Sequence, residues 1–402
     1  MTGSFRHLEF KSKIKSPADE VYRAFIHPTA LKDWLCNAAQ VEPRPGGRLY
    51  FAWEEGYYVN GAFTGLEPGK SLAFTWHGKD EPAATRVTVT LTPEGEQTQL
   101  VLCHDDIPTG PEWDTTTAEL KKGWESALEN LQSMLETGID LREARRPLMG
   151  IFIVEFTPEI AAQLGVPVKE GVRLQGTAEG SGARAAGLQD GDVLVRLAGQ
   201  ELTGYASLGP VIRKYKAGDE VEVAFYRKAE LKTAPLKFSA RVFPRLASRA
   251  AALAKAVKKD FRTLNVALAK RLKDCPEAAL EKRPAEGEWN VKETLAHLIL
   301  CERDQQTWIA SMLNDREIPE SLDYSPNVLP RVQALVAVYP SRQQILTEFK
   351  RNQKESLALL SCLPDKFVAR KHIYNRLARW YLEAPQHHRE HLAQMDALLA
   401  IK

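Results

Sequence analysis

Cysteine is scarce in this chain, and the few cysteines present are scattered. Five occur among 402 residues, an odd number, and no two of them form a CxxC pair. A disulfide framework requires even, regularly spaced cysteines, and a thiolate zinc site requires paired ones. The sequence therefore argues against both and predicts a reducing, cytoplasmic compartment.

Long apolar runs and a strong net charge are also missing. No apolar run approaches the ~20 residues of a membrane helix, and residues 1–7 lack the apolar core of a signal peptide. The formal net charge is only +2, so no global field attracts nucleic acid or an acidic membrane. We therefore expect a soluble protein that binds neither nucleic acid nor membranes.

The remaining composition is that of a globular protein, with 44% hydrophobic and 26% charged residues. A chain of 402 residues suggests two to four domains. Residues 1–142 alternate between strand and helix patterns, and residues 146–245 are rich in glycine and valine. Residues 248–402 consist of long apolar-periodic helices with almost no glycine. These changes predict three domains: α+β, mainly β and all α.

The first region has recognisable element boundaries. Ser16 is a candidate N-cap, with Pro17 at the first helical position. Residues 86–92 alternate strictly, so one face of a strand is predicted to be buried. A closing helix is expected over about residues 116–137. His77 and His104 follow strand-like segments, where a polar catalytic cluster is one interpretation and surface turns are the favoured one.

This order of elements resembles the START/SRPBCC superfamily, in its branch of activators of heat-shock-protein ATPase (AHSA type). The segments that carry the resemblance are residues 16–22, 31–34, 45–47, 61–63 and 123–131. The resemblance implies a helix-grip fold, whose curved sheet often encloses a cavity for a small apolar ligand or serves a client protein. Aromatic side chains that line such a cavity, or else form core, are Trp34, Phe51, Trp53, Phe63, Phe74, Trp76 and Trp124.

The second region contains a glycine-rich motif, Gly182-x-Ala-x-x-Ala-Gly-Leu-x-x-Gly-Asp192. Gly187 is expected to end a short helix with positive φ, and Gly191 to form a tight turn. This motif resembles the PDZ domain in its permuted, bacterial-type form. The resemblance implies that a protein or peptide C-terminus binds beside a strand at 151–154. The implied contacts are Leu148, Met149, Gly150, Ile151, Leu208, Val211 and Ile212.

Such PDZ domains often accompany serine proteases. This chain has no GxSxG motif and no separate region of protease size. We therefore expect peptide binding here without serine protease activity.

Histidines gather in the third region. His387 and His391 are four residues apart and so share one face of a helix. Asn290 and Glu293 predict a capping box at the start of an earlier helix, which carries His297. Three imidazoles from two helices would leave coordination positions open for water or substrate.

These segments resemble the DinB/YfiT-like family of four-helix bundles. Carried over by motif position, the resemblance implies that His297, His387 and His391 hold a divalent metal, zinc or nickel. His388 is an alternative ligand, although the residues after His391 favour His387. Cys301 is a candidate extra ligand or a buried apolar side chain. Pro385 is expected to kink or restart the helix just before the pair.

Two functions remain open from the sequence. The first is a multidomain binding protein that joins a ligand or client site, a peptide site and a metal site, in stress response or detoxification. The second is a metal-dependent enzyme of the DinB type, a thiol-linked transferase, isomerase or hydrolase. The open histidine set favours the second function. Two binding modules and the lack of an evident general base favour the first.

Overall fold

The structure is a computed structural model that describes residues 4–241, 243, 246–284, 288–316 and 328–400. It divides into two compact units. Unit 1 comprises Met1–Ile139 and Pro244–Lys402, and unit 2 comprises Asp140–Phe243. The domain limits taken from the sequence stay a prediction. The first and third regions of that prediction fall into one unit.

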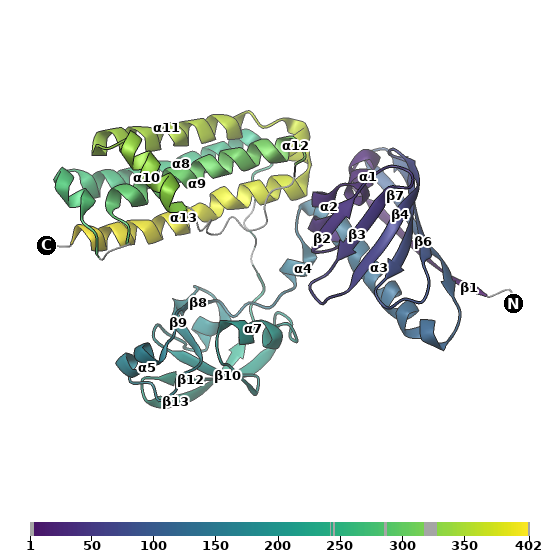
Figure 1. Cartoon of the computed structure of the whole chain (residues 1–402), viewed down its shortest axis with the longest axis horizontal. Helices are drawn as coiled ribbons and strands as arrows, with labels where there is room; N and C mark the ends of the chain where they lie inside the picture. Colours follow the sequence, from purple (N-terminus) through teal and green to yellow (C-terminus); the bar gives the residue numbers. More distant parts are fainter. Residues whose placement is uncertain (1–3, 242, 244–245, 285–287, 317–327, 401–402) are drawn as a thin grey trace. The chain divides into compact units, whose positions relative to one another are not determined.

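The first part of unit 1 is an antiparallel sheet with three helices, drawn in purple and blue in Figure 1. Its seven strands follow the order β1-β7-β6-β5-β4-β3-β2, and consecutive strands in this order are hydrogen-bonded. The strands are β1 (Phe5–Ile14), β2 (Ala38–Val41), β3 (Arg48–Ala52), β4 (Tyr58–Glu67), β5 (Ser71–Gly78), β6 (Thr85–Glu94) and β7 (Gln97–Pro108). The helices are α1 (Ala18–Ile26), α2 (Pro28–Trp34) and α3 (Pro111–Thr137).

The core of this part lies between the sheet and α3. Alternate residues of β6, Val87 and Val89 among them, are buried, as the two-residue alternation predicted. The buried side of α3 meets them with Trp124, Leu128 and Leu131. This arrangement confirms the predicted α+β helix-grip fold.

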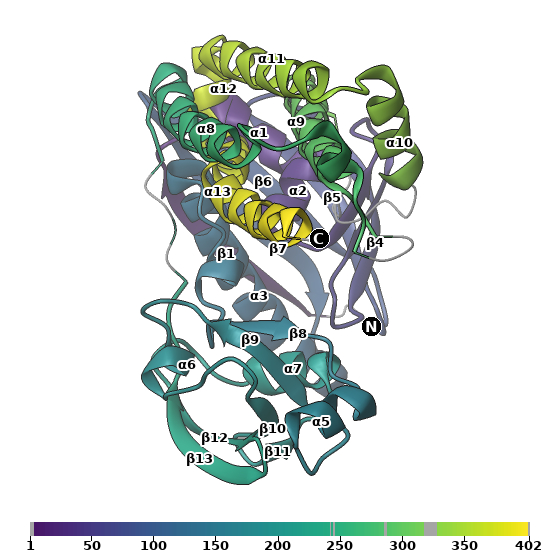
Figure 2. The same cartoon turned by 90° about the vertical axis from the view of Figure 1, so that its left-hand side faces the viewer.

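Unit 2 is a small mainly β fold. Its sheet follows the order β13-β12-β10-β9-β8, with β11 paired to β10. Its elements are α4 (Leu141–Ala144), β8 (Ile151–Val154), α5 (Pro158–Leu164), β9 (Val172–Thr177), α6 (Gly182–Ala185), β10 (Val193–Leu197), β11 (Gln200–Glu201), α7 (Tyr205–Ile212), β12 (Glu220–Arg227) and β13 (Glu230–Lys237). Gly187 and Gly191 have the expected positive φ, +78° and +81°. Figure 2 shows α7 near β8, and together they line a groove.

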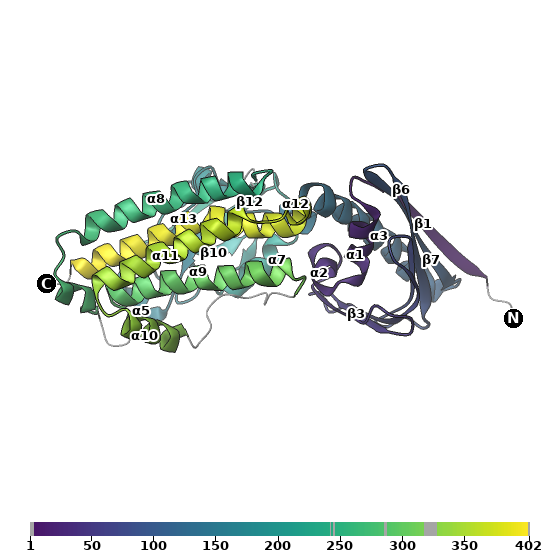
Figure 3. The ribbon, with the colours of Figure 1, turned by 90° about the horizontal axis from the view of Figure 1, so that it is seen from above.

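The second part of unit 1 is helical. Its elements are α8 (Ala250–Leu272), the 3₁₀ turn η1 (Glu277–Glu281), α9 (Val291–Leu313), α10 (Val328–Val338), α11 (Arg342–Ser361), α12 (Asp365–Ala369) and α13 (Lys371–Leu399). The long helices α8, α9, α11 and α13 run alongside one another (Figure 3). Their apolar residues form two clusters, one around Leu253 and Leu377 and another around Leu295 and Phe349.

Several element ends differ from the sequence prediction. The N-cap of α1 is Pro17, because the Ser16 carbonyl accepts a hydrogen bond from the Thr98 hydroxyl and stays outside the helix. The helix predicted at about residue 116 begins at Pro111, where Trp113 is buried.

Two further predictions are corrected by tertiary packing. Helix α13 does not restart at Pro385 but runs unbroken from Lys371 to Leu399. His104 does not sit in a surface turn, since it lies within β7 and is fully buried. Among the described residues, none of the helices combines the length and the apolar character needed to span a lipid bilayer.

Candidate metal centre and binding sites

The start of α9 sets the position of the first histidine. The Asn290 side chain accepts a hydrogen bond from the Glu293 N–H, and the Glu293 carboxylate accepts one from the Asn290 N–H. This confirms the predicted capping box. Arg283 donates to the same Glu293 carboxylate and further secures the turn. His297 follows one turn after Glu293, half-buried on the inner side of α9.

Helix α13 supplies the other two histidines from one face. His387 Nε2 lies 3.4 Å from His297 Nε2 and 2.9 Å from His391 Nε2. One nitrogen from each of the three rings lies within 4.8 Å of the others. All three side chains are half-buried. The structure thus brings together the three histidines that the sequence pattern singled out.

A neighbouring amide orients one ring of this triad. His391 Nδ1 is 2.9 Å from the Gln394 side-chain oxygen, which accepts the Nδ1 proton. In that tautomer the His391 Nε2 lone pair points at His387 Nε2. Two facing lone pairs repel each other unless a cation or proton lies between them. Trp289 packs against the His297 ring, with the two ring centroids 5.0 Å apart.

Electrostatics favour the neutral form of two of the three imidazoles, His297 and His387. Burial, with a further contribution from His391 and His387, lowers the pKa of His297 to about 4. Burial and His391 also lower the pKa of His387. Neutral imidazole is the form that coordinates metal, so these ligands need not lose a proton at pH 7. The donor set and its closeness therefore fit a divalent metal of the zinc or nickel type.

The two alternative ligands are placed differently. His388 is buried beside Phe261, with ring centroids 6.5 Å apart, and lies outside the triad. Cys301 Sγ is 3.5 Å from His297 Nε2 but does not reach the other two histidines. Burial raises the pKa of the Cys301 thiol to about 12. Neither residue belongs to the group of three histidines whose ligand nitrogens lie together.

A hydrogen-bonded belt of polar residues, most of them buried, links α9 to α11 in the helical part. The Ser356 hydroxyl donates to Glu302 Oε2 over 2.6 Å, and the Gln306 amide donates to Ser356 over 3.0 Å. Burial raises the pKa of Glu302 to about 7. Sequence reasoning missed this belt. Its signal is the spacing of four residues between Glu348, Asn352 and Ser356, all on the buried side of α11.

In unit 2, a groove of about 340 Å³ runs between α7 and the loop before β8. Gly150 has φ +77°, and β8 is an edge strand that pairs only with β9 among the described residues. An edge strand can accept another strand, and a loop before it can offer N–H groups to a carboxylate. The lining residues that the sequence predicted are Leu148, Met149, Gly150, Ile151, Leu208 and Ile212.

The lining of this groove differs from the prediction at two residues. Val211 does not line the groove, because it points into the core of unit 2 and is 6% exposed. Tyr205 lines the groove and is 75% exposed, although sequence reasoning did not select it. The only sequence signal for Tyr205 is an aromatic residue at the start of a helix.

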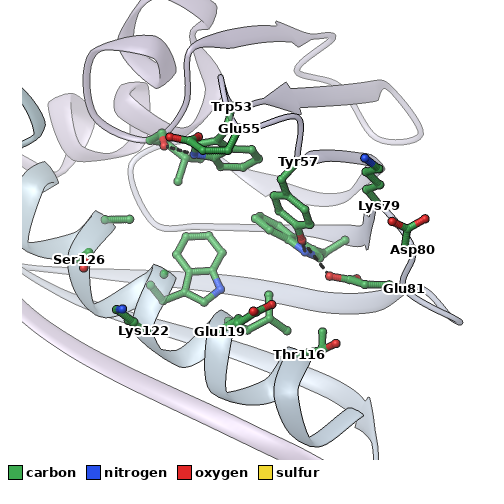
Figure 4. A pocket seen from close by; sticks show the side chains of 16 residues that line it. Trp53, Glu55, Tyr57, Lys79, Asp80, Glu81, Thr116, Glu119, Lys122 and Ser126 are labelled. Carbon is green, nitrogen blue, oxygen red and sulfur yellow. Dashed lines mark hydrogen bonds between the residues drawn. The ribbon is translucent and has the colours of Figure 1, made fainter. Parts of the chain in front are cut away.

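A cavity of about 910 Å³ opens in the first part of unit 1 (Figure 4). Of the aromatic residues predicted for a cavity, Trp53, Trp76 and Trp124 line it. The other four do not line this cavity and pack in the closed core instead, each at most 2% exposed: Trp34, Phe51, Phe63 and Phe74. Lining residues that the sequence prediction did not include are Tyr57, Glu81 and Glu119.

Buried His104 supports the wall of this cavity. Trp124 Nε1 donates to His104 Nδ1 over 3.0 Å, which places the ring proton on Nε2. That proton is donated to the Thr85 hydroxyl at 2.7 Å, and Thr85 donates in turn to the Trp76 carbonyl. Burial lowers the pKa of His104 to about 4, so the ring is neutral. His104 therefore acts as a structural link between two cavity tryptophans.

Three family models match consecutive segments of the chain. The model for Activator of Hsp90 ATPase homolog 1-like protein matches residues 15–136. The model for the PDZ domain matches residues 138–238, and the model for the DinB superfamily matches residues 261–395.

Similar proteins match only parts of the chain. The Escherichia coli periplasmic pH-dependent serine endoprotease DegQ is 30% identical over 92 residues, which cover 23% of this chain and 20% of DegQ. A probable periplasmic serine protease do/HhoA-like of Haemophilus influenzae is 27% identical over 119 residues, 30% of this chain and 25% of that protein. The chain thus spans a quarter or less of the length of these curated relatives.

Two solved structures each match about a third of the chain. Protein MLL2253 from Mesorhizobium loti is 25% identical, with a TM-score of 0.30, over 33% of this chain and 97% of that one. The Aha1 dimer from Colwellia psychrerythraea is 21% identical, with a TM-score of 0.30, over 33% of this chain and 96% of that one. The family models and the fold together establish that the chain joins an AHSA-type domain, a PDZ domain and a DinB-superfamily domain, in that order.

Proposed function

We propose that this chain is a multidomain binding protein whose DinB-type part holds a divalent metal, zinc or nickel, through His297, His387 and His391. The observation that carries the proposal is the convergence of three imidazoles, with His391 oriented by Gln394. The PDZ domain would capture a protein or peptide C-terminus along β8, and the AHSA-type domain would bind a small ligand in its cavity. A role in stress response or detoxification is consistent with these three activities.

Metal analysis of the purified protein tests the central part of this proposal. We expect about one zinc or nickel ion per chain in the wild type, as three imidazoles form one site. His391→Ala should lose most of the metal, because it removes the ligand that Gln394 orients. The matched control is His388→Gln, which changes the adjacent histidine outside the triad and should keep the metal. Unchanged metal content in His391→Ala would refute the site.

A second candidate function is a metal-dependent enzyme of the DinB type. The observation in its favour is that the three protein ligands come from two helices, α9 and α13, which leaves positions for exchangeable ligands. A metal held there would polarise a bound water or bind a thiolate substrate. Glu302, with its pKa of about 7, is a buried acid on the same helix as His297.

Cobalt substitution distinguishes the two functions. In a protein loaded with Co²⁺, a small thiol such as 2-mercaptoethanol should change the visible absorption spectrum if a position is open, because thiolate binds the metal directly. An absorption spectrum that does not change on addition of thiol would indicate a metal saturated by protein ligands. That result would support the binding function and contradict the enzymatic one.

A further inference from the structure

The wall of the AHSA-type cavity is made of aromatic rings that face a common space. The ring centroids of Trp53 and Tyr57 are 5.3 Å apart, those of Trp53 and Trp76 are 6.3 Å apart, and those of Trp76 and Trp124 are 5.2 Å apart. The rings of each pair are tilted by 42° to 53°, so they do not stack face to face. Trp53 and Tyr57 are half-buried and keep ring surface open to the cavity, whereas Trp76 and Trp124 are 4% and 3% exposed and back its wall.

The polar edges of these four rings are already engaged. Trp53 Nε1 donates to the Leu35 carbonyl, and Trp124 Nε1 donates to His104. Trp76 Nε1 donates to the Tyr57 hydroxyl, which donates to the Glu81 carboxylate over 2.8 Å (Figure 4). The indole and phenol donors are thus used within the protein. The half-buried rings of Trp53 and Tyr57 therefore offer an occupant their negative π faces rather than hydrogen-bond donors.

The charged residues of the lining, like the π faces, favour a positively charged occupant. Four carboxylates and two amines line the cavity, which gives a formal net charge of −2 at pH 7. Glu81 is buried, at 8% exposed, and accepts hydrogen bonds from Tyr57 and from the Gly78 N–H. No arginine lies in the lining of this cavity, so an anion finds no guanidinium partner there. A partly enclosed site with this charge favours a cation.

We propose that this cavity binds a small organic cation, a quaternary or protonated amine attached to an apolar body. The cationic group would lie over the faces of Trp53 and Tyr57, with the cavity carboxylates as counter-charge. The volume of about 910 Å³ accommodates an apolar body of drug size. This inference rests on the ligand-binding role proposed above for the AHSA-type domain and specifies the chemistry of its ligand.

A pair of isosteres tests the charge directly. Benzyltrimethylammonium and neopentylbenzene have the same shape and differ by one nitrogen cation in place of a carbon. Isothermal titration of the full-length chain, with tryptophan fluorescence as a second readout, should show the cation binding at least about tenfold more tightly than the neutral compound. Phenylmethanesulfonate, which carries a negative charge, should bind more weakly than either.

Variants locate the effect within the cavity. Trp53→Leu removes a ring face, and Glu119→Gln removes an exposed carboxylate of the lining that the fold does not need. Each should weaken binding of benzyltrimethylammonium severalfold while affinity for neopentylbenzene changes by less than about twofold. Glu96→Gln, which removes an exposed carboxylate outside the cavity, is the matched control and should change neither affinity.

Each remaining outcome decides between the two proposals. If neopentylbenzene binds as tightly as the cation, the cavity accepts neutral apolar ligands and the cation proposal is overturned. The ligand-binding role would then stand. If neither compound binds the folded wild-type chain, both the cation proposal and the small-ligand role of the AHSA-type domain are overturned.

Discussion

Single buried polar residues determine much of the local chemistry of this protein. His104 is fully buried and links Trp124 to Thr85, although two acidic residues, Asp105 and Asp106, follow it in the sequence. Glu302 is 3% exposed and pairs with Ser356 on another helix. The residue type alone does not predict burial at such positions, because the hydrogen-bond partner that permits burial is remote in the sequence.

Glu302 is expected to make stability depend on pH. Its pKa is about 7 in the folded protein and 4.5 as the ordinary value, so folding favours the protonated acid. Its contribution is fully present below pH 4.5 and is lost as the pH rises through 7. The wild type should therefore lose about 3 kcal/mol of unfolding free energy over this window relative to Glu302→Gln.

Urea unfolding followed by circular dichroism between pH 5 and pH 8 measures this difference. Glu302→Gln keeps a side chain of the same size that can still hydrogen-bond Ser356. The comparison subtracts every other titrating group. A wild-type curve parallel to that of the variant across the window would contradict the buried, raised-pKa acid.

At the scale of elements, the start of α9 follows a local rule and the interior of α13 does not. The capping box of Asn290 and Glu293 starts α9 where the residues predicted. Pro385 lies inside α13, where it removes a backbone donor, yet the helix continues to Leu399. Packing of the buried residues Tyr381 and Met395 on either side of Pro385 supplies the stabilisation that propensity lacks.

The edge strand β8 carries the prediction for the PDZ domain. A peptide with a free C-terminal carboxylate and an apolar last residue should bind at least about tenfold more tightly than the same peptide amidated, since the loop before β8 offers N–H groups to the carboxylate. Ile212→Glu should weaken binding of the free-acid peptide, because it introduces a negative charge into the groove. Fluorescence anisotropy with a library of labelled C-terminal peptides measures both effects.

The control for this experiment is Leu231→Glu, which places the same charge on β13 at a residue that is 49% exposed. Leu231 does not line the groove, so peptide affinity should not change. If no peptide of the library binds the wild type, the PDZ domain is a spacer rather than a peptide reader.

At the scale of the whole molecule, segments far apart in the sequence share unit 1. Arg370, at the start of α13, pairs with Glu20 of α1 over 3.0 Å and with Asp315 over 2.8 Å. The Asn375 amide donates to the Thr137 carbonyl over 2.7 Å. The hydrophobic periodicity of the sequence does not predict such contacts. Unit 2, in contrast, is one continuous stretch of chain with its own core.

Gly182 tests whether unit 2 folds independently. A Cβ at this position would lie 1.7 Å from the Lys237 carbonyl oxygen, so Gly182→Ala must push α6 away from β13. We expect this variant to destabilise unit 2 by a few kcal/mol and to lose peptide binding. Metal content should stay at the wild-type level, because the triad belongs to unit 1.

Hydrogen exchange resolved by mass spectrometry, together with metal analysis, measures both halves of this expectation. Gly204→Ala serves as the control, since a Cβ there meets no atom within 4 Å. Loss of metal from Gly182→Ala, with Gly204→Ala unaffected, would mean that the two units do not fold independently.

The residues by themselves determined the order of the three fold types and the shared face of His387 and His391. These features depend on motifs and on the helical period, which act within one element. Tertiary structure decided that His297 meets that pair, that His104 is buried, and that Trp53 lines a cavity while Trp34 fills the core. The physical reason is that periodicity orients a side chain only relative to its own helix or strand. What lies opposite that side chain depends on which elements pack together.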